Sequence, residues 1–433
     1  MIVSASGIRG VLNKDLTVQD VSRFAGNFAS LSGSKEVLLA RDTRSTGQAM
    51  SRAVAAGLMS RGSRVLDFGI ISTPALFRES RVGRKPAVMV TASHNEPEFN
   101  GLKFIVDGVG IGEDAFEAVA NGKGGGVEQL GPGQLRPVPR SAYVDDLVGR
   151  FGAGSCVGVR VALDLGGGAA ISHAVQLVRR LGCDVVSIND AYGVFNRKVD
   201  PVADDLLVLR RLVKERDCDV GLGFDCDGDR LVVVDDEAKK KTGDYMLTLT
   251  LAEMLAETGE KKVVVSFDTT QAVDDIVGKA GGTVFRSKVG EANVVGMMKE
   301  KAARLGGEGS SGGFIDGSFN YCRDSMLAAL VVIRALKQKG RGAYDSVPVY
   351  SQERVALAIP RAKALRGIRK LAGKYDEADS TDGVKVRLSK RSWVLVRPSG
   401  TEDLVRVSAE AETSGKAAQI AKAFAAKVRE LSR

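Results

Sequence analysis

Apolar residues recur along the chain at two spacings, one typical of helices and the other typical of strands. After Thr17 they fall three or four positions apart, which gives a helix over this stretch one apolar face. Asp20 stands three positions after Thr17, the spacing of a capping box. A helix is therefore predicted to begin here, with its apolar face formed by Val18, Val21, Phe24, Ala25 and Phe28.

Short apolar runs alternate with longer amphipathic stretches through most of the chain. The runs at 37–40, 64–70 and 86–90 are predicted to be strands, and residues 45–62 between the first two are predicted to be helical. Alternation of this kind is typical of an α/β fold with a parallel or mixed sheet and helices on both faces.

Three polar or glycine-rich breaks divide the chain. They lie at 121–140, 237–244 and 340–346, and the glycines and prolines of the first are expected to prevent both helix and strand. No internal sequence repeat is strong enough to use. We predict three α/β domains with mixed sheets and a smaller α+β C-terminal domain, bounded at 1–140, 141–236, 237–342 and 343–433.

The composition is that of a water-soluble globular protein, with 44% hydrophobic and 27% charged residues. No stretch reaches 18 uninterrupted apolar residues, and the first residues do not form a leader, so we expect a cytoplasmic protein that does not contact membranes. Five scattered cysteines without a CxxC motif, and only two histidines, indicate reduced thiols and no zinc site.

The formal net charge of +9 favours an anionic partner. Lys and Arg residues are dispersed, and aromatic residues, which would stack on bases, make up only 5% of the chain. Small anionic substrates are therefore expected, and nucleic acid is not.

Three carboxylates alternate in the segment "DCDGDR". Asp225, Asp227 and Asp229 lie between two apolar runs and would repel one another unless a cation lay among them. Oxygen ligands without nearby His or Cys favour Mg²⁺. An EF-hand would need its glycine at loop position six, and here it falls at four. An acidic hairpin turn is the simpler alternative.

The loop "TASHNEPEFNG" at 91–101 follows a predicted strand and places Ser93, His94 and Asn95 side by side. A phosphorylated serine is a good phosphoryl donor when a metal and basic residues neutralise its charge. The alternative is a loop whose polar side chains bond only to its own backbone.

Two further loops contain candidate binding groups. The segment at 307–312 fits G-x-G-x-x-G and overlaps a G-x-S-x-G pattern, but both patterns need a preceding strand, and the residues before it are predicted to be helical. Its carboxylate, Glu308, suits sugar hydroxyls instead. Near the C-terminus, "RPSGTEDLVRV" combines guanidinium groups, hydroxyls and turn amides in a possible phosphate nest: Arg397, Ser399, Thr401 and Arg406.

Taken together, these segments resemble those of the α-D-phosphohexomutase family, almost end to end and in the family's order. The matching segments are "SASGIRG", "TASHNEPEFNGLK", "DCDGDR", "GGEGSSGG" and "RPSGTEDLVRV". The resemblance implies four domains around a central cleft and a reversible transfer of a phosphoryl group between the 6- and 1-positions of a hexose. The sugar loop has no histidine where bacterial members often have one, and Asp403 replaces a usual proline.

The resemblance also assigns roles to residues. Ser93 would carry the phosphoryl group, and Asp225, Asp227 and Asp229 would hold Mg²⁺ against it. The expected catalytic neighbours of Ser93 are Arg9, His94 and Lys103. The expected substrate-binding residues are Asn95, Arg230, Glu308, Ser310, Arg397, Ser399, Gly400, Thr401 and Arg406.

The sugar loop looks most like those of archaeal phosphoglucosamine mutases, which implies glucosamine phosphates as substrates and a sugar 1,6-bisphosphate as activator. A phosphomannomutase/phosphoglucomutase of broad specificity is the alternative within the family. A Mg²⁺-dependent sugar phosphatase and a binding protein without turnover are two alternatives from other classes. The resemblance leaves both a monomer and a homodimer open.

Overall fold

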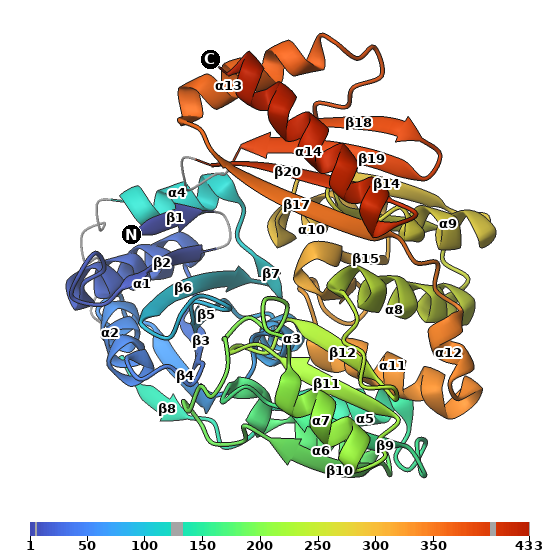
Figure 1. Cartoon of the computed structure of the whole chain (residues 1–433). Coiled ribbons are helices and arrows are strands. Elements are labelled where there is room, and N and C mark those ends of the chain that lie inside the picture. The colour runs from blue at the N-terminus through green and yellow to red at the C-terminus, as the bar shows by residue number, and fades with distance from the viewer. Residues whose placement is uncertain (5–6, 123–132, 399–403, 433) are drawn as a thin grey trace.

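The computed structural model describes residues 1–4, 7–122, 133–398 and 404–432. These residues form four sheets, each with helices packed against it, and the C-terminal unit lies at one end of the molecule (Figure 1). The predicted class is confirmed, because three domains are α/β with mixed sheets and the last has an antiparallel sheet with two helices. We call them the first, second, third and C-terminal domains, and their boundaries stay predictions.

The first domain contains, in its described residues, an eight-stranded sheet of order β1-β2-β6-β5-β3-β4-β8, with β7 paired to β6. Its strands are Ile2–Ser4, Gly7–Val11, Glu36–Arg41, Arg64–Ile70, Ala87–Val90, Phe99–Val106, Val109–Gly110 and Leu135–Pro137 (β1 to β8). Its helices are Val18–Ser32, Gly47–Met59, Thr73–Gly83 and Glu113–Asn121 (α1 to α4).

Both faces of this sheet are covered, as the alternating sequence predicts. Val37 and Leu39 of β3 pack with α1 and α2, whereas Leu38 and Ala40 pack with α3 on the other face. The capping box of Thr17 at the start of α1 is confirmed. The expectation that no strand forms within 121–140 is wrong, since β8 pairs with β4 at the sheet edge, where a proline is tolerated.

The second and third domains have one topology, which no sequence repeat had indicated. The second sheet has the order β10-β9-β11-β12 and the third has the order β14-β13-β15-β16, with the last strand antiparallel in both. The strands are Arg160–Asp164, Asp184–Ile188, Val220–Phe224, Leu231–Asp235, Lys262–Ser266, Thr283–Ser287, Leu305–Glu308 and Gly313–Asp316 (β9 to β16). The helices are Tyr143–Phe151, Ala174–Arg180, Leu207–Glu215, Gly243–Thr258, Ala272–Lys279, Glu291–Lys301, Ser325–Lys339 and Gly342–Asp345 (α5 to α12), with short 3₁₀ turns at Ala169–Ser172 (η1) and Gly309–Ser311 (η2).

Strands β4, β3, β5 and β6 of the first domain follow the same order. In all three domains the link between the third and fourth of these strands is a short loop that begins at the carboxyl end of the third strand. These loops lie between β5 and β6, between β11 and β12, and between β15 and β16. They contain Ser93, the three aspartates and the 309–312 turn respectively, so one topology presents three of the predicted site segments.

The C-terminal domain has an antiparallel sheet of order β17-β20-β19-β18. Its strands are Ser351–Ala358, Val384–Ser389, Ser392–Pro398 and Leu404–Ala411 (β17 to β20), and its helices are Arg361–Ala372 and Ser414–Leu431 (α13 and α14). Among the described residues, no helix has the length and apolar character needed to cross a membrane.

The buried core is continuous across the first three domains. One cluster joins residues of α3, the second-domain sheet, and helices α8 and α11 of the third domain. The C-terminal domain has a core of its own, and a small cluster of Phe267, Trp393 and Leu395 connects it to the third domain.

Candidate active site

A cavity of about 1150 Å³ opens where the four domains meet. All four domains contribute polar residues to its lining, so the central cleft is confirmed. These residues include Arg9, His94, Asn95, Lys103, Asp200, Arg230, Asp268, Glu291, Glu308, Ser310, Arg323, Arg354, Arg397 and Arg406.

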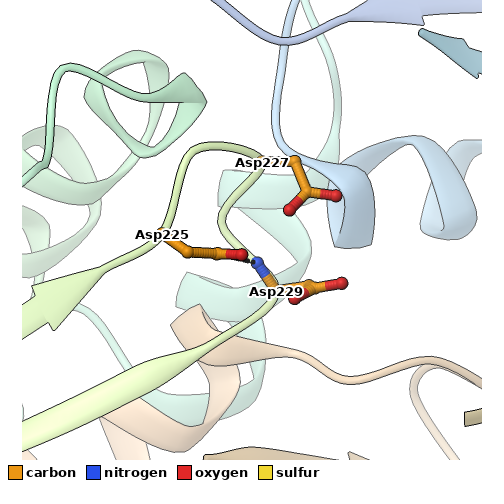
Figure 2. A group of neighbouring side chains, drawn as sticks. All are labelled: Asp225, Asp227 and Asp229. Carbon is orange, nitrogen blue, oxygen red and sulfur yellow. Dashed lines mark hydrogen bonds between the residues drawn. The ribbon is translucent and has the colours of Figure 1, made fainter. Parts of the chain in front are cut away.

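The three aspartates of the metal loop, residues 225–230, lie close to one another in a tight turn (Figure 2). They do not line the cavity themselves, but their contacts Lys103 and Arg323 do. All three are fully buried, and one carboxylate oxygen from each lies within 4.8 Å of the others. Asp225 Oδ1 accepts hydrogen bonds from the backbone N–H groups of Asp229, at 3.0 Å, and Arg230, at 3.1 Å. Burial, with the charges of Asp229 and Asp227, raises the pKa of Asp225 well above its usual range.

A glycine turn after β9 supports this loop from behind. Gly166 and Gly167 have φ of 55° and 65°, the left-handed region that glycine adopts at little cost. A Cβ added at Gly168 would lie 2.7 Å from the carbonyl oxygen of Cys226, and Ala169 N–H donates to that same oxygen. The glycines of "DLGGGAA" thus let the two backbones approach closely.

Cations already balance part of the aspartate charge. Lys103 Nζ lies 2.8 Å from Asp227 Oδ2 and 3.0 Å from Asp229 Oδ2, and Arg323 Nη2 lies 2.8 Å from the latter oxygen. Burial favours the neutral form of Asp229, but Arg323 and Lys103 outweigh it and hold its pKa below the ordinary value. Burial would also lower the pKa of Lys103, but Asp227 and Asp229 raise it.

The donor set fits a hard divalent cation. Asp227 Oδ1 and Asp229 Oδ1 are buried and have no hydrogen-bond partner among the described residues. An anionic oxygen buried without a partner is costly, and a cation bound by carboxylate oxygens removes that cost. The three aspartates are therefore suited to hold Mg²⁺.

Ser93 lies directly against this loop. Its side chain is fully buried, so it lies beneath the cavity wall, and its hydroxyl donates to Asp225 Oδ2 at 3.3 Å. Ser93 has a φ of 52°, a left-handed conformation that costs energy for a residue other than glycine. Its backbone N–H donates to Thr91 Oγ1 at 2.8 Å.

One arginine that sequence reasoning missed fixes this strained loop. The buried guanidinium of Arg44 donates to four backbone carbonyl oxygens, those of Ser93, Asn95, Glu96 and Phe99, at 2.5 to 2.9 Å. Asp42 pairs with Arg44 at 3.1 Å. The polar run after β3 was a usable signal, because charged residues following a buried strand often mark the functional edge of a sheet.

The flanking residues of Ser93 contact other predicted site residues. Arg9 Nη1 donates to Asn95 Oδ1 at 2.6 Å. His94 Nδ1 lies 3.5 Å from Ser93 Oγ, and His94 Nε2 lies 3.3 Å from Arg230 Nη2. Burial, followed by Arg230 and Arg9, lowers the pKa of His94 to about 2, so its ring is neutral. Arginine only donates, so Nε2 accepts and Nδ1 directs its proton toward Ser93.

The sugar-loop turn lines a neighbouring part of the cavity. Glu308 Oε1 accepts from Gly290 N–H at 2.7 Å, its Oε2 lies 3.2 Å from Arg323 Nη1, and Ser310 lines the cavity nearby. The premise that no strand precedes this loop is wrong, since α10 ends at Lys301 and β15 leads into the turn. A dinucleotide site still does not fit, because β16 follows the turn where such a site needs a helix.

The C-terminal domain brings arginines to the remaining side of the cavity. Arg354, Arg397 and Arg406 line it, and Arg397 Nε lies 2.9 Å from Asp382 Oδ2. Three predicted residues of this segment, Ser399, Gly400 and Thr401, lie outside the described residues. The cavity thus has a buried carboxylate end and a basic end.

Sequence reasoning missed the residues that support the site from neighbouring segments. Thr73 Oγ1 donates to Asp227 Oδ2 at 2.6 Å, and Asp200 pairs with Arg230 at 3.0 Å. Arg323 contacts both the metal loop and the sugar loop. Thr73, Asp200 and Arg323 do not belong to any motif. Thr73 lies in "STPA" at the start of a helix, where hydroxyl groups often form hydrogen bonds with nearby backbone groups.

The chain belongs to the phosphoglucomutase/phosphomannomutase family. The family models of alpha/beta/alpha domains I, II and III match residues 1–122, 141–240 and 242–351, and that of the C-terminal domain matches residues 354–427. The protein is therefore a phosphohexomutase, an isomerase that acts on small phosphosugars.

Two archaeal relatives are similar over nearly their whole length. A protein of Methanopyrus kandleri named "Probable phosphoglucosamine mutase" is 32% identical over 97% of this chain and 96% of its own. One of the same name from Thermococcus gammatolerans is 32% identical over 96% and 95%. A solved structure of a phosphoglucomutase/phosphomannomutase family protein from Burkholderia thailandensis has a TM-score of 0.87 at 26% identity, covering 99% of this chain and 98% of that one.

Proposed function

We propose that the protein interconverts glucosamine 6-phosphate and glucosamine 1-phosphate through a phosphorylated Ser93 and a bound sugar 1,6-bisphosphate. The observation that carries this proposal is the position of Ser93 Oγ, 3.3 Å from one of three clustered aspartates, at the carboxylate end of a cavity whose other end is basic. A phosphoryl donor at one end and an anion site at the other suit a sugar phosphate that passes through a 1,6-bisphosphate.

In the first half-reaction the bond between phosphorus and Ser93 Oγ breaks, and phosphorus forms a bond to a hydroxyl oxygen of the sugar phosphate. The hydroxyl proton leaves that oxygen and balances the charge left on Ser93 Oγ. After the bisphosphate turns around, the same step runs in reverse with the other phosphoryl group. Asp225, Asp227 and Asp229 would hold Mg²⁺, which when bound neutralises phosphoryl charge.

The basic residues around Ser93 have distinct roles in this scheme. Lys103 stays protonated beside Asp227 and Asp229, which raise its pKa, so it balances charge next to Ser93. Neutral His94 offers its Nδ1 proton to a phosphoryl oxygen. Arg9, which holds Asn95, and Arg230, which is held by Asp200, supply positive charge on either side.

The far end of the substrate is bound by the other two domains. Glu308 and Ser310 are proposed to accept and donate hydrogen bonds to sugar hydroxyls. Arg397 and Arg406, with Ser399, Gly400 and Thr401, are proposed to bind the phosphate that is not reacting. Binding energy from that phosphate orients the hydroxyl oxygen that attacks.

Glucosamine is proposed as the sugar on two grounds. The relatives quoted above are named for it, and the cavity contains a carboxylate suited to its cationic amino group. Asp268 lines the cavity, bonds to Ser266 Oγ at 2.8 Å, and has no ion-pair partner in the parts of the chain that the structure describes. A phosphomannomutase/phosphoglucomutase of broad specificity is the second candidate. Mannose and glucose phosphates have no amino group to pair with Asp268, so with these substrates the Asp268 carboxylate would be hydrated instead.

The test is phosphorus NMR of the purified protein with Mg²⁺, a trace of glucose 1,6-bisphosphate as activator, and glucosamine, mannose or glucose 1-phosphate in separate tubes. We expect the 6-phosphate to form fastest, by kcat/KM, from glucosamine 1-phosphate, and we expect chelation of Mg²⁺ by EDTA to stop the reaction. Preference for mannose or glucose would favour the broad-specificity enzyme. Release of inorganic phosphate without an isomer would overturn the mutase in favour of a phosphatase.

A further inference from the structure

Arg323 is a buried cation that sequence reasoning did not single out and that has no role in the scheme above. It lies just before α11 and lines the cavity with only 8% of its surface exposed. Its guanidinium reaches carboxylates from three different segments of the chain. Nη2 lies 2.8 Å from Asp229 Oδ2, Nη1 lies 3.2 Å from Glu308 Oε2, and Nε lies 3.2 Å from Glu291 Oε2.

These contacts join two sites that have separate tasks. Asp229 belongs to the metal loop of the second domain, and Glu308 begins the sugar-loop turn of the third domain. A guanidinium is a rigid planar fork, so moving one of its carboxylate partners displaces the other. Lysine, with a single nitrogen, cannot hold both carboxylates in fixed directions.

The backbones of the two loops are held together independently of Arg323. Leu231 N–H, directly after the metal loop, donates to the carbonyl oxygen of Gly312 in the sugar-loop turn at 3.0 Å. The metal loop is also bound by α11, whose Ser325 Oγ donates to the carbonyl oxygen of Gly228 at 2.5 Å. Changing Arg323 should therefore leave the loops in place and alter the orientation of the two carboxylates. Arg323 therefore links the carboxylates of Asp229 and Glu308, in addition to any contribution to folding.

The chain also makes room for this side chain. A Cβ added at Gly313 on β16 would lie 2.2 Å from Arg323 Cδ and 2.6 Å from its Cγ. The glycine thus lets the arginine stem lie flat against β16. Gly313→Ala would displace the stem while keeping the charge, which separates the effect of position from the effect of charge.

We propose that Arg323 is a positioning residue that couples the metal loop to sugar binding, so that a sugar phosphate held by Glu308 tightens binding of the divalent ion at Asp229, and the ion tightens binding of the sugar. By thermodynamic linkage the two effects are equal. This inference rests on the proposed roles of Glu308 and the three aspartates. It adds that the two sites communicate, and it names the group that connects them.

The experiment measures binding without turnover. Mn²⁺, detected by electron paramagnetic resonance, serves as the metal probe, and glucosamine 6-phosphate is added at saturation to the dephosphorylated protein. We expect the sugar phosphate to tighten Mn²⁺ binding by about 5- to 150-fold in the unaltered protein, the usual range of such coupling. In Arg323→Lys and in Gly313→Ala the factor should fall toward one.

Arg304→Lys is the matched control. Arg304 directly precedes β15 and pairs with the buried Asp316 at the end of β16, at 3.0 Å. It does not line the cavity. Its variant should keep the full coupling factor. Equal coupling in Arg323→Lys and the unaltered protein would overturn the proposal, and so would its absence from the unaltered protein when both ligands bind. If glucosamine 6-phosphate does not bind at all, the proposed function fails and the coupling proposal with it.

Discussion

The two ends of the cavity are built in opposite ways. At the carboxylate end, Ser93 and the three aspartates are fully buried, fixed by Arg44, Lys103 and Arg323, and set against a core shared by three domains. At the basic end, the arginines belong to a domain with a separate core. Polar contacts to the third domain are made by Glu410, Lys385 and Asp382.

This difference separates the residues that transfer the phosphoryl group from the residues that bind the rest of the substrate. Phosphoryl transfer depends on fixed charges near the reacting atoms, and fixed charges need a rigid surrounding. A bisphosphate that turns around needs space and a binding group that can release and regain it. A small apolar cluster joins the third and C-terminal domains. It suits that second need, because few apolar contacts must change when the distal phosphate leaves.

The largest expected effect is at the rigid end. Ser93→Ala removes the oxygen that carries the phosphoryl group, and we expect turnover to fall at least about 10³-fold. Phosphorus NMR measures the loss, and intact mass should show no phosphorylated form. Retention of full activity would remove Ser93 from the mechanism.

Removing the support of the phosphoserine loop tests how far its rigidity matters. Arg44→Met leaves Asp42 buried without its cation and frees four carbonyl oxygens, so we expect a loss of about 3 to 5 kcal/mol in the free energy of unfolding. The folded fraction should also have lower kcat. Denaturation and steady-state kinetics measure both, and Arg64→Met, which removes an exposed pair with Glu36, should cost at most about 1 kcal/mol.

A pH series tests whether the sugar loop belongs to the rigid end. Burial raises the pKa of Asp244 to about 7, and this side chain lies under the turn, where a Cβ at Gly309 would be 1.9 Å from Asp244 Oδ1. The folded state binds more protons than the unfolded state between pH 4 and 7. The contribution of Asp244 to stability is therefore full below about pH 4 and declines, by on the order of 4 kcal/mol, as pH rises through 7.

Asp244→Asn keeps an acceptor for Thr270 N–H and cannot ionise. We expect chemical denaturation of this variant to depend less on pH between 5 and 8 than that of the unaltered protein. Parallel pH profiles for the two proteins would show that the turn opens enough to hydrate the carboxylate, and the sugar loop would then belong with the mobile end.

The smallest effect is expected at the interface of the C-terminal domain. Glu410 is fully buried and accepts from Gln271 N–H and Trp393 Nε1, both at 2.8 Å. Glu410→Ala should loosen the docking of this domain, raising KM for the sugar phosphate about tenfold with little change in kcat. Glu412→Ala, whose exposed partner is Lys416, is the control. A fall in kcat at constant KM would contradict the division between the two ends.

The sequence predicted the parts of the site that lie close together along the chain. Three carboxylates within five residues, or a hydroxyl beside an imidazole and an amide, indicate their chemistry through spacing alone, and apolar periodicity predicted α1, β3 and β4. Family resemblance supplied the roles that spacing could not. The strand before the 309–312 turn was missed because "LGGE" has only one large apolar residue, and its burial comes from neighbouring strands.

The supporting residues were missed for a different reason. Arg44, Thr73 and Arg323 act on loops that are 15 to 154 residues away in the chain, and no local pattern reports a contact at that range. Their importance becomes visible only when the topology brings the three loops to one cavity. The repeated order of strands in the first three domains, absent from the sequence as a repeat, is what does so.

Trp393 is the only tryptophan in the sequence, and it lies in the cluster between the third and C-terminal domains with 2% of its surface exposed. Lys385 Nζ lies 4.0 Å from the centre of its ring. The protein therefore carries an intrinsic fluorophore at the one interface expected to open and close. Its emission should shift to longer wavelength whenever this interface separates and water reaches the indole, so domain movement can be followed in real time without a label.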